Sequence, residues 1–247
     1  MALGSVIYLI ILKRLKMAFK LILRGVMKMK VLIACEESQA VCIAFRAKGH
    51  EAYSADIQDC SGGHPEWHIK GDVLPIINGN ADFVTMDGTA HRIDGKWDLL
   101  IAHPPCTYMS NAGACRMYPQ KGLINAERLK KALEAKKFFM EFYNADCPQI
   151  CIENPMPMKV VNLPIENQRI QPYQFGEPWS KKTYLWLKGL PCLKPTKICT
   201  DYKPFVPSGT GRKLGGDSYG ARNCAHDSKS RSKTFPGIAQ AMAEQWG

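Results

Sequence analysis

From Lys30 to the C-terminus, the sequence alternates short apolar runs with longer amphipathic segments, and this alternation restricts the fold more than any other feature. Two amphipathic segments, 36–50 and 125–145, have the spacing of apolar residues that is typical of helices, and Gly49 is placed to end the first. Strands that alternate with helices in this way predict an α/β fold with a mostly parallel central sheet and helices on its faces. Four apolar runs are typical of buried parallel strands: KVLIAC (30–35), EAYSADI (51–57), WDLLIA (97–102) and PQICIENP (148–155).

The other segments predict one main domain, at residues 29–247. In segment 73–96, the NG and DG dipeptides favour a β-hairpin beside the sheet. Beyond residue 188 the chain turns to Pro, Gly, Lys and Ser, which are typical of exposed loops. Segment 234–246, TFPGIAQAMAEQW, predicts a C-terminal helix. Residues 1–28 are expected to be an extension outside the fold, because the domain begins at MKMKVLIAC. Their apolar run is too short to span a bilayer and is followed by Lys and Arg, so the alternative is an amphipathic basic helix that touches nucleic acid or a membrane surface.

The formal net charge of +11 is unevenly distributed over the 247 residues. Residues 181–233 contain twelve Lys or Arg and three acidic residues, whereas residues 31–180 are net negative. Clustered Lys and Arg favour a polyanionic partner such as nucleic acid, although an ordinary solvated basic surface has the same composition. The candidate contacts to nucleic acid are Arg212, Lys213 and Arg222.

The ten cysteines contain no CxxC pair and no paired Cys/His spacing. This pattern argues against a zinc ribbon and against a small disulfide-linked scaffold. We therefore expect no structural metal, a reducing compartment such as the cytoplasm, and cysteines that mostly fill the core. We also expect no membrane partner.

Acidic side chains follow several of the predicted strands, at the edge where open α/β sheets bind ligands. A carboxylate after the second strand can accept hydrogen bonds from both ribose hydroxyls, and one in the next loop can accept from an adenine amino group. Taken singly, each acid also fits a helix cap or a surface group. No glycine-rich phosphate loop is present, so a cofactor without a pyrophosphate, such as S-adenosylmethionine, fits best. The candidate cofactor-binding residues are Cys35, Glu36, Glu37, Asp56, Ile57, Asp72, His103 and Pro104.

Cys106 directly follows two prolines in WDLLIAHPPCTYMSNAG, residues 97–113. The prolines stiffen the chain and remove two N–H donors, so the loop presents the thiol at the carboxyl edge of its strand and does not coil into a helix. A thiolate there is suited to attack an electron-poor carbon. Core packing is the usual role of a lone cysteine, but a Pro-Pro loop followed by polar residues is poor core material.

Glu153 ends the apolar strand in ICIENP, where Pro155 fixes the turn. An apolar position disfavours the charged form of a carboxyl group, so we expect Glu153 to hold a proton and donate it to a ring nitrogen. Capping of a neighbouring helix is the alternative role.

Together, these motifs resemble the cytosine-C5 DNA methyltransferase family, especially its compact members from bacteriophages and prophages. WDLLIAHPPCTYMSNAG is similar to the family's proline-cysteine nucleophile loop, and CIENP is similar to its Glu-Asn loop. GDVLPII and the C-terminal SKTFPGIAQAMAEQW are weaker matches, and the resemblance runs from about Lys30 to the end of the chain. It implies a Rossmann-like, S-adenosylmethionine-dependent methyltransferase fold with a reduced, basic recognition region at about 188–233.

By this resemblance, Cys106 adds to C6 of cytosine in DNA, Glu153 engages N3 of the ring, and Asn154 shapes the loop. The C5 carbon then takes the methyl group of S-adenosylmethionine, and in duplex DNA the target base is flipped out of the stack. Lys181 and Lys182 stand where the family has an arginine that steadies the base. The loop after the first strand, ACEESQAV, departs from the family's Phe-x-Gly-x-Gly pattern.

Two other functions fit the same features. In the first, the same fold and nucleophile act on RNA, a free nucleotide or an already modified pyrimidine, which agrees with the reduced recognition region. In the second, the chain is a non-catalytic DNA-binding relative, such as a decoy in phage defence, which agrees with the altered cofactor loop. The joint presence of Cys106 and Glu153 argues against the second.

Overall fold

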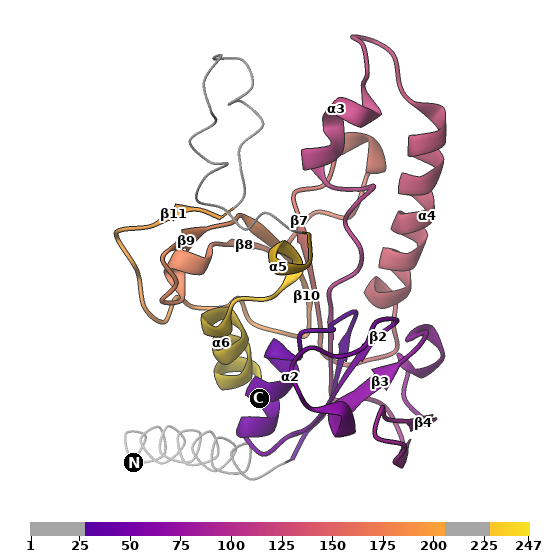
Figure 1. Ribbon diagram of the computed structural model, residues 1–247, viewed down its shortest axis with the longest axis vertical. Helices are drawn as coiled ribbons and strands as arrows, with labels where there is room; N and C mark the ends of the chain where they lie inside the picture. Colours follow the sequence, from indigo (N-terminus) through magenta and orange to yellow (C-terminus); the bar gives the residue numbers. More distant parts are fainter. Residues whose placement is uncertain (1–27, 206–227) are drawn as a thin grey trace, which may run out of the picture.

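The computed structural model describes residues 28–205 and 228–247, and its centre is a seven-stranded sheet (Figure 1). The strand order is β3-β2-β1-β6-β7-β10-β8, in which β10 is antiparallel to both of its neighbours and the other pairs are parallel. The predicted α/β class and mostly parallel sheet are therefore confirmed, and the architecture is compatible with a Rossmann-like fold. The strands of this sheet are β1 (Lys30–Ala34), β2 (Glu51–Asp56), β3 (His68–Lys70), β6 (Leu99–Ala102), β7 (Ile150–Pro155), β8 (Gln168–Ile170) and β10 (Thr183–Lys188).

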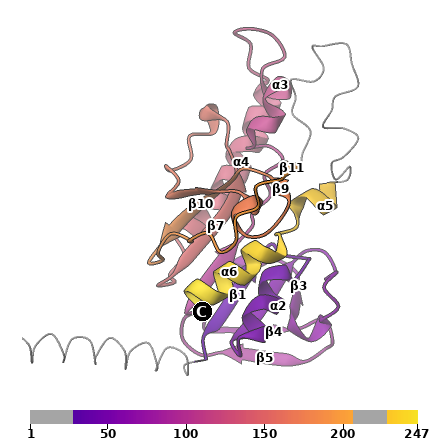
Figure 2. The same cartoon turned by 90° about the vertical axis from the view of Figure 1, so that its left-hand side faces the viewer.

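Helices cover both faces of the sheet. α2 and α6 pack against each other on one face, and α4 lies on the other (Figure 1, Figure 2). The predicted helices in 36–50, 125–145 and 234–246 are α2, α4 and α6, so these three predictions are confirmed. The helices are α2 (Ala40–Ala47), α3 (Ala114–Met117), α4 (Ala126–Tyr143), α5 (Ser228–Ser232) and α6 (Pro236–Trp246). Short 3-10 turns are η1 (Pro65–Trp67), η2 (Leu74–Ile76), η3 (Asn111–Gly113), η4 (Lys159–Val161) and η5 (Pro172–Gln174).

Each face of the sheet has its own hydrophobic core, because side chains alternate between the two faces along a strand. On one face, Leu100 of β6 belongs to the core that contains Phe139 of α4. On the other face, Ile101 belongs to the core that contains Phe45 of α2 and Trp246 of α6. The central strands are therefore buried on both sides, which explains their continuous apolar sequences.

Gly49 ends α2, as the sequence predicts. Its φ of 87° is in the left-handed region, which glycine adopts without a steric penalty from a Cβ atom. The Gly49 N–H donates to the Arg46 carbonyl over 2.9 Å, and the His50 N–H donates to the Phe45 carbonyl over 3.2 Å. This pattern of hydrogen bonds is a Schellman motif, and it turns the chain into β2.

The hairpin predicted in segment 73–96 is confirmed. Its strands are β4 (Ala81–Val84) and β5 (Ala90–Ile93), which pair antiparallel. The Asp87 carboxylate holds the turn by accepting hydrogen bonds from the Thr85 hydroxyl over 2.6 Å and from the Thr89 hydroxyl over 2.7 Å. These bonds lower the pKa of Asp87 to about 2.

A second small sheet lies at the start of the basic C-terminal region. It consists of β9 (Trp179–Ser180) and β11 (Lys203–Pro204), which pair parallel. The candidate nucleic-acid contacts Arg212, Lys213 and Arg222 lie outside the described residues, as does the expected N-terminal extension except for its last residue. In the described part of the chain, no helix is long and apolar enough to cross a membrane.

The strand order changes direction at β1. β2 and β3 lie on one side of β1, whereas β6 and β7 lie on the other. The loops that follow β1 and β6 therefore lead in opposite directions from neighbouring strand ends. Such a switch point is where open α/β sheets bind their ligands.

Candidate active site

The register of the strands places four of the predicted site residues in one row at the carboxyl edge of the sheet. Ala34 of β1 pairs with Ala55 of β2 and with Ala102 of β6. Ala102 in turn pairs with Ile152 of β7. The sequence thus brings candidate cofactor residues and the candidate acid to the same edge. The residues that directly follow these four positions are Cys35, Asp56, His103 and Glu153.

Hydrogen bonds join the end of β7 and the loop after it to the loop that follows β6. The side-chain amide of Asn154, which is 1% exposed, donates to the Pro104 carbonyl over 2.8 Å. Further along both loops, the Asn111 N–H donates to the Met156 carbonyl over 2.8 Å. These bonds hold the Cys106 loop against the strand that carries the candidate acid.

The chain turns directly after Cys106. The Cys106 carbonyl accepts a hydrogen bond from the Ser110 N–H over 2.8 Å, and helical structure begins only at Asn111 with η3 and the short α3. Arg128 of α4 supports the turn from outside by donating to the Thr107 carbonyl over 2.9 Å. The loop therefore presents the thiol before any helix starts.

Glu153 and His103 form a close pair in the middle of the row. Nδ1 of His103 lies 3.4 Å from Oε2 of Glu153, and the two side chains are 8% and 16% exposed. Burial raises the pKa of Glu153, but hydrogen bonds from His103 and Thr183 and the charge of Lys181 outweigh burial and hold this pKa below its ordinary value. The expectation that Glu153 holds a proton is therefore wrong, because its carboxyl group is ionised at neutral pH.

The Cys106 thiol lies close to groups of both charges. Burial raises its pKa above the ordinary value and the charge of Glu153 raises it further, whereas Lys181 and Arg231 lower it. The Lys181 ammonium donates to the Arg231 carbonyl over 2.7 Å and lies 5.8 Å from the centre of the Phe235 ring. The C-terminal segment that contains α5 therefore completes the site.

Two of these partners, Arg231 and Thr183, were missed by reasoning from the sequence. Thr183 lies opposite Pro155 only because β10 runs back antiparallel along β7. No motif marks Arg231, and the fold alone brings it to the thiol. Of the two candidate lysines, only Lys181 joins the site, because Lys182 is exposed and makes no hydrogen bond or ion pair within the described part of the chain.

Three candidate cofactor residues converge beside the switch point. The pKa of Cys35 is raised to about 12, first by burial and then by the charges of Asp56 and Asp72. Oδ1 of Asp56 accepts a hydrogen bond from the Gln58 N–H over 2.9 Å, and Oδ1 of Asp72 accepts from the Leu74 N–H over 3.0 Å. Each carboxylate keeps its Oδ2 atom outside these turn contacts, and Oδ2 can accept from a ligand.

Glu36 caps the start of α2, which is the alternative role that the sequence allows for the acidic residues after the strands. It is 4% exposed, and its Oε1 atom accepts from the Val41 N–H over 2.7 Å while Oε2 accepts from the Cys42 N–H over 3.2 Å. Burial raises the pKa of Glu36, although the charge of His103 and the two cap bonds oppose the rise. Both carboxylate oxygens are thus used by the start of α2.

The remaining cofactor candidates differ in accessibility. Glu37 and Pro104 are buried, whereas Ile57 is 77% exposed directly after Asp56. Only Ile57 of these three offers an open apolar surface to a ligand at the sheet edge.

The nine cysteines within the described residues are all free thiols. Cys42, Cys147 and Cys151 are buried, whereas Cys115 and Cys192 are exposed. The expectation that most cysteines fill the core is therefore wrong. Across residues 28–205 and 228–247, no group of three or more His, Cys, Asp or Glu side chains is arranged to hold a metal ion.

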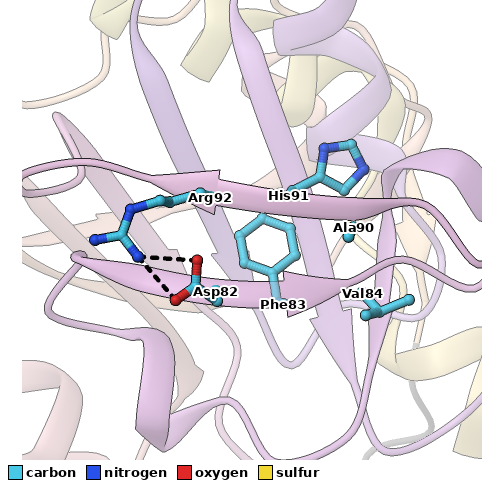
Figure 3. Close-up of a pocket in the computed structure, with 6 residues that line it drawn as sticks. All are labelled: Asp82, Phe83, Val84, Ala90, His91 and Arg92. Carbon is cyan, nitrogen blue, oxygen red and sulfur yellow. Dashed lines mark hydrogen bonds and ion pairs between the residues drawn. The ribbon is translucent and has the colours of Figure 1, made fainter.

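A pocket on the β4–β5 hairpin lies on a different element from this edge (Figure 3). The Arg92 guanidinium donates to both carboxylate oxygens of Asp82, over 2.9 and 2.8 Å. Both ring nitrogens of His91 lie 3.1 Å from a hydroxyl group, one of Tyr53 and one of Thr85. These polar groups are already paired with one another, so we interpret the pocket as structural. Its lining residues are Asp82, Phe83, Val84, Ala90, His91 and Arg92.

The carboxyl edge of the sheet therefore combines a thiol, a carboxylate with an imidazole beside it, and two cations. Such a set can add a thiolate to an electron-poor ring and manage the proton on a ring nitrogen. No protein-family model matches the chain, and no curated protein matches it.

Proposed function

We propose that this chain is an S-adenosylmethionine-dependent methyltransferase of Rossmann-like fold that methylates C5 of cytosine in DNA. The observation that carries the proposal is that Cys106, Glu153 and Lys181 come together from three separate segments. The charge of Lys181 lowers the pKa of both Cys106 and Glu153, and the charge of Glu153 raises the pKa of Cys106. The mostly parallel sheet, with its antiparallel β10, fits the fold that the resemblance implies.

A thiol is the group that this reaction requires. Cytosine C5 is too weak a nucleophile to take a methyl group until another group adds at C6. In the proposed step, the Cys106 thiolate forms a bond to C6 while the electron pair of the C5–C6 double bond moves to C5. Glu153 engages N3, and Lys181 and Arg231 favour the thiolate. After methyl transfer, a base removes the C5 proton, and the electron pair returns to expel the thiolate.

S-adenosylmethionine fits the residues at the switch point. It supplies the methyl group as an electrophile. The carboxylates of Asp56 and Asp72 can accept hydrogen bonds from the ribose hydroxyls and the adenine amino group, and the exposed Ile57 offers an apolar surface beside them. Glu36 takes no part, because α2 uses both of its oxygen atoms.

DNA as the acceptor is supported by positive charge around the thiol. Lys181 and Arg231 act on Cys106, and they belong to the strongly basic segment 181–233. Cations at this position can contact the phosphates that flank a flipped base.

Nucleoside analysis by mass spectrometry tests the proposal. DNA from cells that express the protein is expected to contain 5-methylcytosine above the level in cells without it. Cys106→Ser is expected to abolish the increase, because a hydroxyl group does not form the thioether to C6. Cys115→Ser is the matched control, since Cys115 is an exposed thiol in α3, the short helix that follows the Cys106 loop, and it is expected to keep the activity.

Other outcomes assign other functions. Methylated cytosine in RNA or in free nucleotides, with none in DNA, would move the acceptor to those classes. A folded wild-type protein that methylates none of these substrates would contradict the proposal.

A further inference from the structure

His103 links the two halves of the site. The backbone N–H of His103 donates to the Ala34 carbonyl over 2.9 Å, so the residue lies beside the end of β1. Nδ1 of its ring lies 3.4 Å from Oε2 of Glu153. The ring is 8% exposed, and its Nε2 atom is buried with no hydrogen-bond partner among the described residues. The imidazole is therefore enclosed by protein with one nitrogen directed at the catalytic carboxylate.

Glu153 cannot act as a proton donor in its resting state. Its surroundings hold the pKa of the carboxyl group below its ordinary value, so the group is ionised at neutral pH. The proposed reaction nevertheless needs a proton at N3 of the ring while C6 is attacked. That proton must reach Glu153 from a neighbouring group.

Among the described residues, His103 is the titratable group in hydrogen-bond contact with Glu153. Lys181 acts on Glu153 through its charge, and Thr183 contributes a hydroxyl group that does not titrate near neutral pH. An imidazole is the side chain that changes its charge in this range.

We propose that His103 supplies the proton that Glu153 delivers to the base; this inference rests on the function proposed above. In the first step, the Nδ1–H bond of the imidazolium breaks and an O–H bond forms on Glu153. In the second step, that O–H bond breaks and an N–H bond forms at N3, while the Cys106 thiolate adds to C6. When the thiolate leaves, the proton returns from N3 to Glu153 and then to His103, so no proton is consumed along this path.

Charged groups from three elements surround this path. Glu36 acts on the imidazole from the loop after β1, and Glu153 acts on it from β7. Lys181, from the segment before β10, acts on both Glu153 and Cys106. The imidazole therefore lies between two carboxyl groups, those of Glu36 and Glu153, and interacts with both through its charge.

The test compares His103→Asn with His103→Leu, two side chains of nearly equal size. Asn places an N–H donor where Nδ1 of His103 lies, so it can still orient Glu153, but it cannot release a proton. The measured quantity is the single-turnover rate of the denaturation-resistant adduct between Cys106 and DNA in which 5-fluorocytosine replaces cytosine. Below neutral pH, both variants are expected to be about 100-fold slower than the wild type.

The pH dependence separates proton supply from orientation. The ratio of the wild-type rate to the rate of the His103→Asn protein cancels the titration of Cys106, which both proteins share. This ratio is expected to fall as the pH rises, because an imidazole that has lost its extra proton can no longer supply one. His91→Asn, which changes a histidine of the β4–β5 hairpin, is the control for the substitution itself.

Each result is decisive. If the His103→Asn protein is as fast as the wild type, His103 does not supply the proton and the inference is overturned. A slow His103→Leu protein would then leave His103 with an orienting role, and a fast one would leave it with no role in the reaction. A ratio that does not change with pH would also overturn it. A wild-type protein that forms no adduct at any pH would instead contradict the proposed function.

Discussion

At the scale of single residues, the reactivity of Cys106 depends on neighbours that oppose one another. Burial and Glu153 raise the pKa of the thiol, and Lys181 and Arg231 lower it. Because the resulting pKa is above the ordinary value, the thiolate is a minor species at neutral pH. Each cation therefore increases the amount of thiolate.

Replacement of Lys181 by Gln is expected to slow alkylation of Cys106. Loss of the cation raises the pKa of the thiol, so the thiolate population at neutral pH falls, and the rate falls with it by about fivefold. The rate is measured with iodoacetamide, followed by peptide mass spectrometry at Cys106. Lys188→Gln, at the far end of β10, is expected to leave the rate unchanged. Equal rates in Lys181→Gln and the wild type would show that Lys181 does not assist the thiol.

The sequence predicted the positions of Cys106 and Glu153 better than their ionisation. The positions follow from local signals, namely the proline pair and the end of an apolar strand. The ionisation of Glu153 depends on Thr183 and Lys181, which lie in another part of the sequence and reach the site only through strand pairing. A carboxyl group at an apolar strand end holds a proton only if the fold places no hydrogen-bond donor or cation next to it. The sequence around Glu153 does not show that the fold places Thr183 and Lys181 there.

At the scale of elements, α2 begins with an unusual cap. The side chain of Glu36, four residues before the start of the helix, accepts hydrogen bonds from the Val41 and Cys42 N–H groups. Glu36→Ala leaves these groups without that acceptor and is expected to lower the free energy of unfolding by about 1 to 2 kcal/mol. Ser38→Ala is the control, because the Ser38 hydroxyl is 3.5 Å from the Ala40 nitrogen and contributes little. Urea unfolding of both variants measures the difference.

The cost of Glu36→Ala is expected to depend on pH. Because burial raises the pKa of Glu36 above its unfolded value, the wild type has this group's full contribution below the ordinary pKa of 4.5 and loses it as the pH rises through the folded pKa. The alanine variant has no carboxyl group to titrate. The difference in unfolding free energy should therefore be larger near about pH 5 than near about pH 8. A difference that grows with pH would contradict the assigned environment of Glu36.

The elements that the sequence predicted are those with a local signal. β1, β2, β6 and β7 are continuous apolar runs, and α2, α4 and α6 have helical periodicity, so each was located within a few residues. β3 has only three residues, too few for a pattern to be recognised. β8 and β10 were not predicted as strands, because β10 is held by antiparallel pairing with β7 and β8 by antiparallel pairing with β10, and no local pattern encodes these pairings.

At the scale of the whole molecule, the C-terminal segment joins the two sides of the candidate site. Lys181 donates to the Arg231 carbonyl on the side of the thiol. On the other side, the Lys233 ammonium lies 3.2 Å from the Ser61 hydroxyl, in the loop that follows β2. α6 then packs on α2 and ends with the Trp246 indole donating to the Pro191 carbonyl over 3.0 Å. The C-terminal segment thus connects the proposed cofactor side to the side of the Cys106 thiol.

The same arrangement predicts where the proposed cofactor, S-adenosylmethionine, binds. Asp56 follows β2, and its charge reaches Cys35 at the switch point of the sheet. Asp56→Ala is expected to weaken binding of S-adenosylmethionine by about 1.5 to 3 kcal/mol, because a ribose hydroxyl loses a charged acceptor. Isothermal titration calorimetry measures the affinity directly and needs no knowledge of the methyl acceptor.

Asp59→Ala provides the matched control, since Asp59 belongs to the same loop but forms an exposed ion pair with Lys70 at 2.6 Å. Its removal should leave the affinity for S-adenosylmethionine unchanged, because exposed ion pairs contribute little to stability and Asp59 is not among the charges that raise the pKa of Cys35. If Asp56→Ala folds and binds S-adenosylmethionine as tightly as Asp59→Ala does, the ribose does not lie at the end of β2. The position of the cofactor, and with it the direction from which the methyl group reaches the base, would then have to be sought elsewhere along the carboxyl edge of the sheet.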